Sequence, residues 1–155
     1  MISPRKLVLA SYIAVGSLFA QHAAWAAEGI TAVKSPRPVK ETMDRVESVA
    51  KERGLMVFAR IDHAAGAAKV GKTLRPTEVL VFGNPQGGTP LMECAQSMGI
   101  DLPLKALVWQ DAAGQVWLGY NDVAYLARRH DAGTCPAVEN VGKALSGLAA
   151  AVVAP

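Results

Sequence analysis

The chain has 155 residues, of which 51% are hydrophobic, 19% are charged and 6% are aromatic. This length and composition predict one globular domain with an apolar core. They exclude a polytopic membrane protein, which carries fewer charges, and a disordered chain, which carries fewer apolar residues. The formal net charge is +3.

The first 26 residues have the layout of a secretory signal peptide. Arg5 and Lys6 precede a charge-free apolar run at residues 7–20, and a tail of small residues ends in Ala24-Trp25-Ala26, an A-x-A cleavage site. The alternative is an uncleaved membrane anchor, but a spanning helix needs about 20 apolar residues and this run is shorter. We therefore expect cleavage near Ala26, a periplasmic or secreted product, and no stable membrane insertion after processing.

Cleavage also changes the charge of the product. Removal of Arg5 and Lys6 lowers the net charge from +3 to +1. A nearly neutral domain offers no strongly basic surface to a phosphate backbone, so we expect no nucleic-acid partner.

The first half of the remaining chain alternates between strand and helix patterns. A short strand is predicted at 29–34. Apolar Val39, Met43, Val46 and Ala50 then recur at spacings of 4, 3 and 4, which indicates an amphipathic helix that Gly54 ends. Residues 55–61 alternate as a strand with one buried face does. Residues 62–71 are rich in alanine and predict a short helix.

The second half predicts further helices and a hairpin. The β-branched, apolar run at 77–83 indicates a central strand. Thr89 and Pro90 open a helix with an apolar stripe of Leu91, Cys94, Ala95 and Met98, which Gly99 ends. Strands at 105–110 and 115–120 flank a turn with a late glycine, which is typical of a hairpin. A short helix capped by Asn121 or Asp122 runs through Arg129, and a last helix has its apolar stripe at Val138, Val141, Leu145, Leu148 and Val152.

This order of elements predicts an α+β fold, a two-layer sandwich with helices packed mainly on one face of a sheet of about five strands. The sheet is mixed or antiparallel. The connections 61–77 and 83–105 are each long enough to be a parallel crossover, which leaves strand direction open.

Three segments resemble one known family, the domain of unknown function 302. They are residues 57–66 (VFARIDHAAG), residues 82–92 with their Phe-Gly-Asn-Pro and Thr-Pro-Leu-Met pieces, and residues 100–108 (IDLPLKALV). The resemblance covers about residues 29–153 and implies a compact α+β domain with helices on one side of a curved sheet. It implies no reaction. The positions that look like its signature are Asp62, His63, Gly83, Asn84, Pro85, Thr89, Asp101 and Pro103.

His63 and Asp62 are the candidate catalytic residues. A histidine that follows a strand end could accept a proton, helped by the neighbouring carboxylate. The alternative is structural: Asp62 caps the helix and His63 is an exposed loop residue. We expect no metal site, because the sequence has no set of three or four ligands at metal-binding spacing, and no cofactor.

The loop after the central strand is the candidate ligand-binding segment. Backbone N–H groups of Gly87, Gly88 and Thr89 at a helix start could hold an anion, with Asn84 beside them. The alternative is a tight turn in which Asn84 bonds to the local backbone. If the two strands before His63 and Asn84 run parallel, both side chains emerge at the same edge of the sheet and form one site.

Two further groups of residues are open to more than one interpretation. Cys94 and Cys135 form a disulfide, remain buried thiols or act in redox chemistry. Arg60, with Lys105, Trp109, Trp117 and Tyr120, could line one sheet face and bind an acidic ligand, although packing explains these residues equally simply.

Together these patterns predict an exported, non-enzymatic binding or accessory module for a small and, on this interpretation, anionic ligand. One alternative is an enzyme in which His63 and Asp62 transfer a proton. A second is a self-associating structural subunit, which would form a homodimer through an apolar patch.

Overall fold

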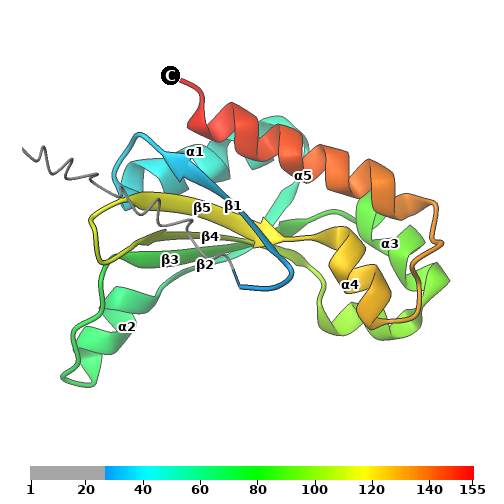
Figure 1. The fold of residues 1–155 in the computed structure, drawn as a ribbon, viewed down its shortest axis with the longest axis horizontal. Helices are drawn as coiled ribbons and strands as arrows, with labels where there is room; N and C mark the ends of the chain where they lie inside the picture. Colours follow the sequence, from blue (N-terminus) through cyan, green and yellow to red (C-terminus); the bar gives the residue numbers. More distant parts are fainter. Residues whose placement is uncertain (1–26) are drawn as a thin grey trace, which may run out of the picture.

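The computed structural model describes residues 27–155; the predicted signal peptide at residues 1–26 lies outside this part of the chain. One sheet of five strands in the order β1-β5-β4-β3-β2 organises the fold (Figure 1). The strands are β1 (Ile30–Ser35), β2 (Met56–Asp62), β3 (Thr77–Gly83), β4 (Leu104–Gln110) and β5 (Val116–Asn121). The helices are α1 (Val39–Glu52), α2 (His63–Lys69), α3 (Pro85–Cys94), α4 (Val123–Arg129), α5 (Ala137–Val153) and a 3-10 helix, η1 (Gln96–Ile100). The predicted α+β class is confirmed.

Every neighbouring pair of strands in this sheet is antiparallel. The parallel crossovers that the sequence left open are therefore wrong. Both long connections contain a helix, but that helix lies beyond an end of the sheet, and the chain returns beside the strand it has just left. In β2 and β3, Met56 pairs with Gly83 and Asp62 pairs with Glu78. The residues that follow these two strands consequently leave the sheet at opposite ends.

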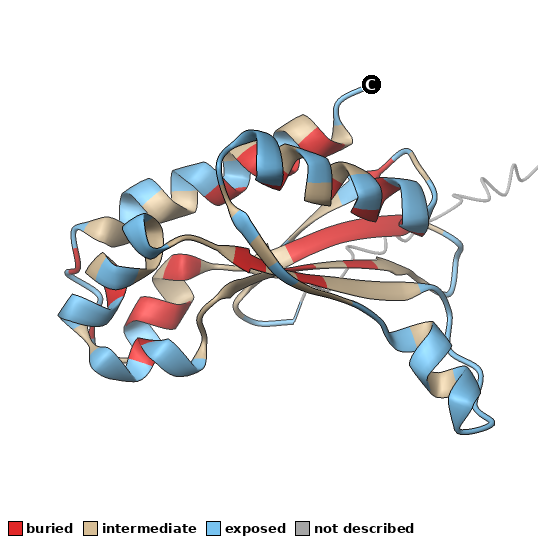
Figure 2. Cartoon of the chain, turned by 180° about the vertical axis from the view of Figure 1, so that it is seen from behind, coloured by how far each residue is buried: buried red, intermediate tan, exposed pale blue. Residues whose placement is uncertain are grey.

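Helices α1 and α5 pack on one face of the sheet, and the core lies beneath them (Figures 1 and 2). The predicted stripe of α1 is confirmed, since Val39, Met43, Val46 and Ala50 are all buried. On α5 the second half of the predicted stripe is buried, whereas Val138 and Val141 near its start are only half-buried. The start of α5 therefore packs less closely than its end.

Helix α3 differs from its prediction at both ends. It begins at Pro85, before the glycine pair, because the Asn84 side chain caps it. It ends at Cys94, where the chain changes to η1 instead of continuing to Gly99. Met98 of η1 is still buried, whereas Cys94, the last residue of α3, is exposed. The expectation that Cys94 belongs to a buried stripe is wrong.

The second face of the sheet carries an aromatic pair. Trp109 of β4 pairs with Trp117 of β5, and their rings stack with centroids 6.4 Å apart. The ammonium of Lys34 lies 5.6 Å from the centre of the Trp117 ring, and Trp117 Nε1 donates a 2.8 Å hydrogen bond to Asp111. These contacts tie the hairpin turn and β1 to the centre of the sheet.

Candidate functional site

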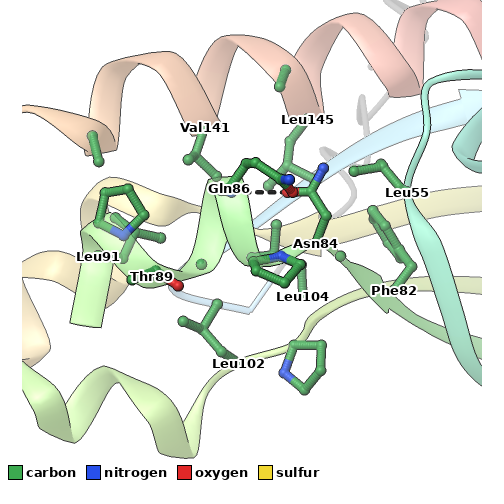
Figure 3. Close-up of a pocket in the computed structure, with 18 of the residues that line it drawn as sticks. Leu55, Phe82, Asn84, Gln86, Thr89, Leu91, Leu102, Leu104, Val141 and Leu145 are labelled. Carbon is green, nitrogen blue, oxygen red and sulfur yellow. Dashed lines mark hydrogen bonds between the residues drawn. The ribbon is translucent and has the colours of Figure 1, made fainter. Parts of the chain in front are cut away.

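A cavity of about 1040 Å³ lies between one end of the sheet and helices α3 and α5 (Figure 3). Ligand sites in proteins have volumes of about 300–1,000 Å³, so this space is large enough for a drug-sized molecule. Its walls are mainly apolar side chains: Leu55, Phe58, Phe82, Leu91, Leu102, Leu104, Val141 and Leu145. Strands β2, β3 and β4 supply its floor, and the two helices supply its sides.

Small residues on the two helices explain why this space is hollow. Gly87 and Gly88 of α3 line the cavity without side chains, and Ala137 and Ala144 of α5 line it with single methyl groups. A Cβ added at Gly88 would have Leu102 at 3.8 Å as its nearest neighbour, an ordinary contact. The two helices therefore face each other across space that larger side chains would fill.

Asn84 fixes the helix that forms one wall of this cavity. Its Oδ1 atom accepts a 2.8 Å hydrogen bond from the backbone N–H of Gly87, and its carbonyl oxygen accepts one of 3.1 Å from Gly88. The two glycine N–H groups proposed for an anion are therefore already used within the cap. Asn84 has the local backbone role that the sequence offered as the alternative.

The polar groups around the cavity are few and lie on its helices and rim. Gln86, Thr89 and Asn140 line it, and their side chains make no hydrogen bond to another residue of the described chain. Arg53 is the one charged residue among the described lining residues. Its guanidinium donates to the carbonyl oxygens of Ala144 and Gly147 at 3.3 and 3.0 Å, so the cation is held against α5.

The structure separates the predicted site residues into two groups. Asn84, Gly87, Gly88 and Thr89 all line the cavity. Asp62 and His63 lie at the other end of β2, because β2 and β3 are antiparallel. The expectation that His63 could share an edge with Asn84 is wrong for this topology.

His63 is exposed at the first position of α2, and Asp62 is its helix cap. The Asp62 carboxylate accepts a 2.8 Å hydrogen bond from the backbone N–H of Ala65. This is the structural role considered for Asp62 as the alternative to proton transfer. Neither residue lines the cavity.

Arg60 is an ion-pair centre and does not line the cavity. Its guanidinium contacts Glu78 of β3 at 2.7 Å and, from α1, Asp44 at 2.6 Å and Glu47 at 3.4 Å. Burial alone would lower the pKa of Arg60, but the hydrogen bonds to Glu78 and Asp44 outweigh it and raise this pKa above its ordinary value. Arg60 thus fastens α1 to the edge of the sheet.

Strand pairing also shows that the proposed sheet-face set of five residues does not share one face. Leu80 pairs with Arg60 and with Ala106, and Ala106 pairs with Tyr120, so Arg60 and Tyr120 lie on the helix-covered face. Lys105, Trp109 and Trp117 alternate to the other face. The expectation of one common face is wrong.

The ion pairs of Asp44 and Glu47 with Lys40, Lys51 and Arg60 predict a specific dependence of stability on pH. Hydrogen bonds from Lys40 and then Arg60 lower the pKa of Asp44 below 3.8, and a hydrogen bond from Lys51 lowers that of Glu47 below 4.5. A carboxyl group with a depressed folded-state pKa stabilises the fold above its unfolded pKa and loses this contribution as the pH falls. The free energy of unfolding should therefore fall between pH 5 and pH 3.

The variant Arg60→Met tests this assignment. It leaves Glu78, whose side chain is 12% exposed, without its cation, and should lower the free energy of unfolding at pH 7 by about 1–3 kcal/mol. It should also reduce, but not abolish, the loss of stability below pH 5, because Lys40 and Lys51 still lower the pKa values of Asp44 and Glu47. Urea denaturation across this pH range measures both effects. A variant whose stability depends on pH as the wild type's does would show that Arg60 does not contribute to the pH dependence.

His130 lies in a polar junction, with 8% of its side chain exposed. Its Nε2 atom lies 2.7 Å from Asp101 and its Nδ1 atom 2.9 Å from the hydroxyl of Ser97. Arg129 also contacts Asp101, at 3.0 Å. The ring joins η1 to the end of α4, and none of these residues lines the cavity. Sequence patterns could not predict this junction, because its partners are far apart in the sequence.

Cys94 and Cys135 form a disulfide with their Cα atoms 5.9 Å apart. Of the three alternatives weighed for these residues, the structure shows the first. The bond joins the last residue of α3 to the segment that leads into α5. It therefore links the two helices that form the sides of the cavity.

Among residues 27–155, no group of three or more His, Cys, Asp or Glu side chains is placed to hold a metal ion. No helix in that part of the chain is long and apolar enough to cross a membrane.

Fold and site together define a small two-layer α+β domain with an apolar cavity at one end of its sheet. The chain belongs to the family described as Domain of unknown function DUF302, which matches residues 31–152. A solved structure described as an uncharacterized conserved DUF302 protein from Bacillus stearothermophilus has the same fold, with a TM-score of 0.67 and 22% identity over 82% of this chain and 97% of that one.

Proteins from Brucella also match part of this chain. One is named fluoride-specific ion channel FluC 1, from Brucella suis biovar 1 (strain 1330), and is 50% identical over 105 residues, which are 68% of this chain and 41% of that protein. A protein of the same name from Brucella abortus biovar 1 (strain 9-941) is also 50% identical over 105 residues, 39% of its length. This chain therefore spans about two-fifths of the length of these relatives.

Proposed function

We propose that this DUF302 domain is a binding module for an amphipathic small molecule with an apolar chain and an anionic head. The observation that carries this proposal is the apolar cavity between the sheet, α3 and α5. Its walls would cover the apolar chain, and burial of apolar surface would supply most of the binding free energy. This ligand is more specific than the small anionic ligand predicted from sequence, because the cavity adds an apolar chain to it.

Arg53 supports an anionic head group. It is the one charged lining residue of the described chain, and a guanidinium has five N–H donors. Two hydrogen bonds to α5 carbonyls leave donors free for a carboxylate. The amides of Gln86 and Asn140 lie among the same lining residues and add neutral hydrogen-bond donors and acceptors.

The proposed site is separate from the residues of the enzyme hypothesis. An active site based on His63 requires a concave pocket around the ring, whereas the His63 side chain is exposed on α2. The cavity therefore supports binding more strongly than it supports proton transfer.

We also propose that the binding module acts outside the cytosol. Residues 1–26 have the pattern of a signal peptide, and a disulfide between Cys94 and Cys135 is stable in an oxidising compartment. Mass spectrometry of the protein isolated from its natural source should find an N-terminus close to Ala27. A product that retains residues 1–26 in the cytosol would contradict this proposal.

A series of fatty acids of increasing length tests the ligand proposal. Each added methylene should strengthen binding about fourfold until the cavity is full, because burial of one CH₂ contributes about 0.8 kcal/mol. Isothermal titration calorimetry of the purified protein measures the series. Equal affinity for all lengths, or no binding at any length, would overturn the proposal.

A matched pair of variants tests whether the fatty-acid chain binds in the cavity. Ala144→Trp places an indole in the cavity from α5 and should abolish binding. Ala150→Trp makes the same change at an exposed position of the same helix that does not line the cavity, and should leave binding unchanged.

Fatty alcohols of the same length should bind more weakly than the acids, and Arg53→Met should remove this difference.

A further inference from the structure

Residues 63–76 form an arm that projects from the sheet at the end opposite the cavity. The arm consists of α2 and the loop that leads to β3, and it stands apart from the other helices (Figure 1). No residue of α2 is buried. Near the tip, Val70 is 72% exposed and Leu74 is 48% exposed. Two large apolar side chains are thus left in water on a projecting arm, where a partner outside the molecule could cover them.

The charge of the arm is of one sign. Lys69, Lys72 and Arg75 lie beside the exposed apolar residues, and no carboxylate occurs between Asp62 and Glu78. Within residues 27–155, none of these three cations forms an ion pair with the protein. The Arg75 Nε atom donates a 3.1 Å hydrogen bond to the carbonyl oxygen of Gln110, which holds the base of the arm against the sheet.

We propose that this arm docks the protein on an anionic lipid surface. Val70 and Leu74 enter the boundary between head groups and acyl chains, while Lys69 and Lys72 face the lipid phosphates. Arg75 stays at the base of the arm, where it holds the arm against the sheet. The positive charge of the arm complements an anionic surface. The exposed apolar side chains fit a surface that also has an apolar layer beneath its charges, as a lipid bilayer does. A nucleic acid offers the charge without that layer, so it matches only half of the arm.

This docking mode is independent of the proposed ligand site. The arm follows the Asp62 end of β2, whereas the cavity lies at the Met56 end. A protein bound through the arm therefore keeps its cavity away from the lipid surface, and failure of either proposal leaves the other standing.

Co-sedimentation with lipid vesicles tests the proposal. The protein should bind vesicles of phosphatidylcholine and phosphatidylglycerol, should not bind phosphatidylcholine alone, and should dissociate as salt is raised. Lys69→Ala and Lys72→Ala should each weaken binding about fivefold. Lys143→Ala, which removes one exposed charge from α5, is the matched control and should leave binding unchanged. All variants share one N-terminus, so differences between them report the arm alone.

The variant Val70→Ser separates a lipid surface from other polyanions. Loss of binding by Val70→Ser, with an unchanged unfolding transition, supports insertion of the arm. Normal binding by Val70→Ser, equal binding to neutral vesicles, or equal effects of the Lys69 and Lys143 substitutions would each overturn the proposal. Size-exclusion chromatography that shows a dimer dependent on Val70 would also overturn it, because the arm would then contact a second copy.

Discussion

Replacement of Phe82 by alanine is expected to lower the free energy of unfolding by about 3–5 kcal/mol. Phe82 lies in β3 with 0% of its surface exposed, and it contributes to both the core and the floor of the cavity. Truncation removes a buried ring and leaves a space that the sheet and helix α1 cannot close. Urea denaturation followed by circular dichroism measures the loss.

Phe58 provides the matched control for this prediction. It lines the same cavity but is 54% exposed, so Phe58→Ala should change the free energy of unfolding by less than about 1 kcal/mol. A ligand in the cavity would cover part of the Phe58 ring, so the same substitution should weaken fatty-acid binding several-fold. Equal losses of stability in the two variants would show that Phe82 is not the core residue that its burial indicates.

The elements predicted best from sequence are those whose side chains repeat with the period of the backbone. The stripe of α1 and the alternation around the turn at Asp111 correspond to a helix and a hairpin in the structure. The start of α3 could not be predicted in the same way, because two glycines and a proline normally indicate a loop. In the structure Asn84 caps this segment through a hydrogen bond from Gly87, and Pro85 occupies the first turn, where proline is tolerated.

Strand direction was beyond the reach of these patterns. A parallel and an antiparallel strand both alternate, and a connection long enough for a crossover is also long enough to fold beyond the end of the sheet. Strand direction determines which residues can share a site, because the antiparallel pairing of β2 and β3 separates His63 from Asn84. The resemblance in sequence indicated both residues but not the distance between them.

The cavity could be predicted only in part. The sequence indicates Asn84, Gly87, Gly88 and Thr89 as an anion-binding segment, because a helix start after a strand is a common anion site. The sequence places Val141 and Leu145 only in the apolar stripe of a helix, since apolar residues that line a cavity and those that fill a core have the same pattern. Whether such residues line a cavity or fill a core depends on the size of the residues on the facing helix. Which residues of two helices face each other is a property of the tertiary structure.

Loss of the disulfide is expected to destabilise the protein by about 4 kcal/mol. Cys94 and Cys135 are 41 positions apart in sequence, and a cross-link of this length removes a large part of the conformational entropy of the unfolded chain. The double variant Cys94→Ala/Cys135→Ala should show this loss in urea denaturation, and the reduced wild-type protein should show the same loss. A loss below about 1 kcal/mol in both would mean that the unfolded chain is compact without the bond.

The same bond predicts an effect on ligand binding that separates its two roles. If the disulfide acts only on the unfolded chain, the reduced protein is less stable but binds fatty acids as tightly as before. The bond, however, joins the end of α3 to the segment before α5, and these helices form the sides of the cavity. Reduction should therefore also weaken binding, measured by calorimetry at a temperature where both forms are folded. Unchanged affinity on reduction would show that the α3 cap at Asn84 and the packing of α5 hold the cavity walls without the cross-link.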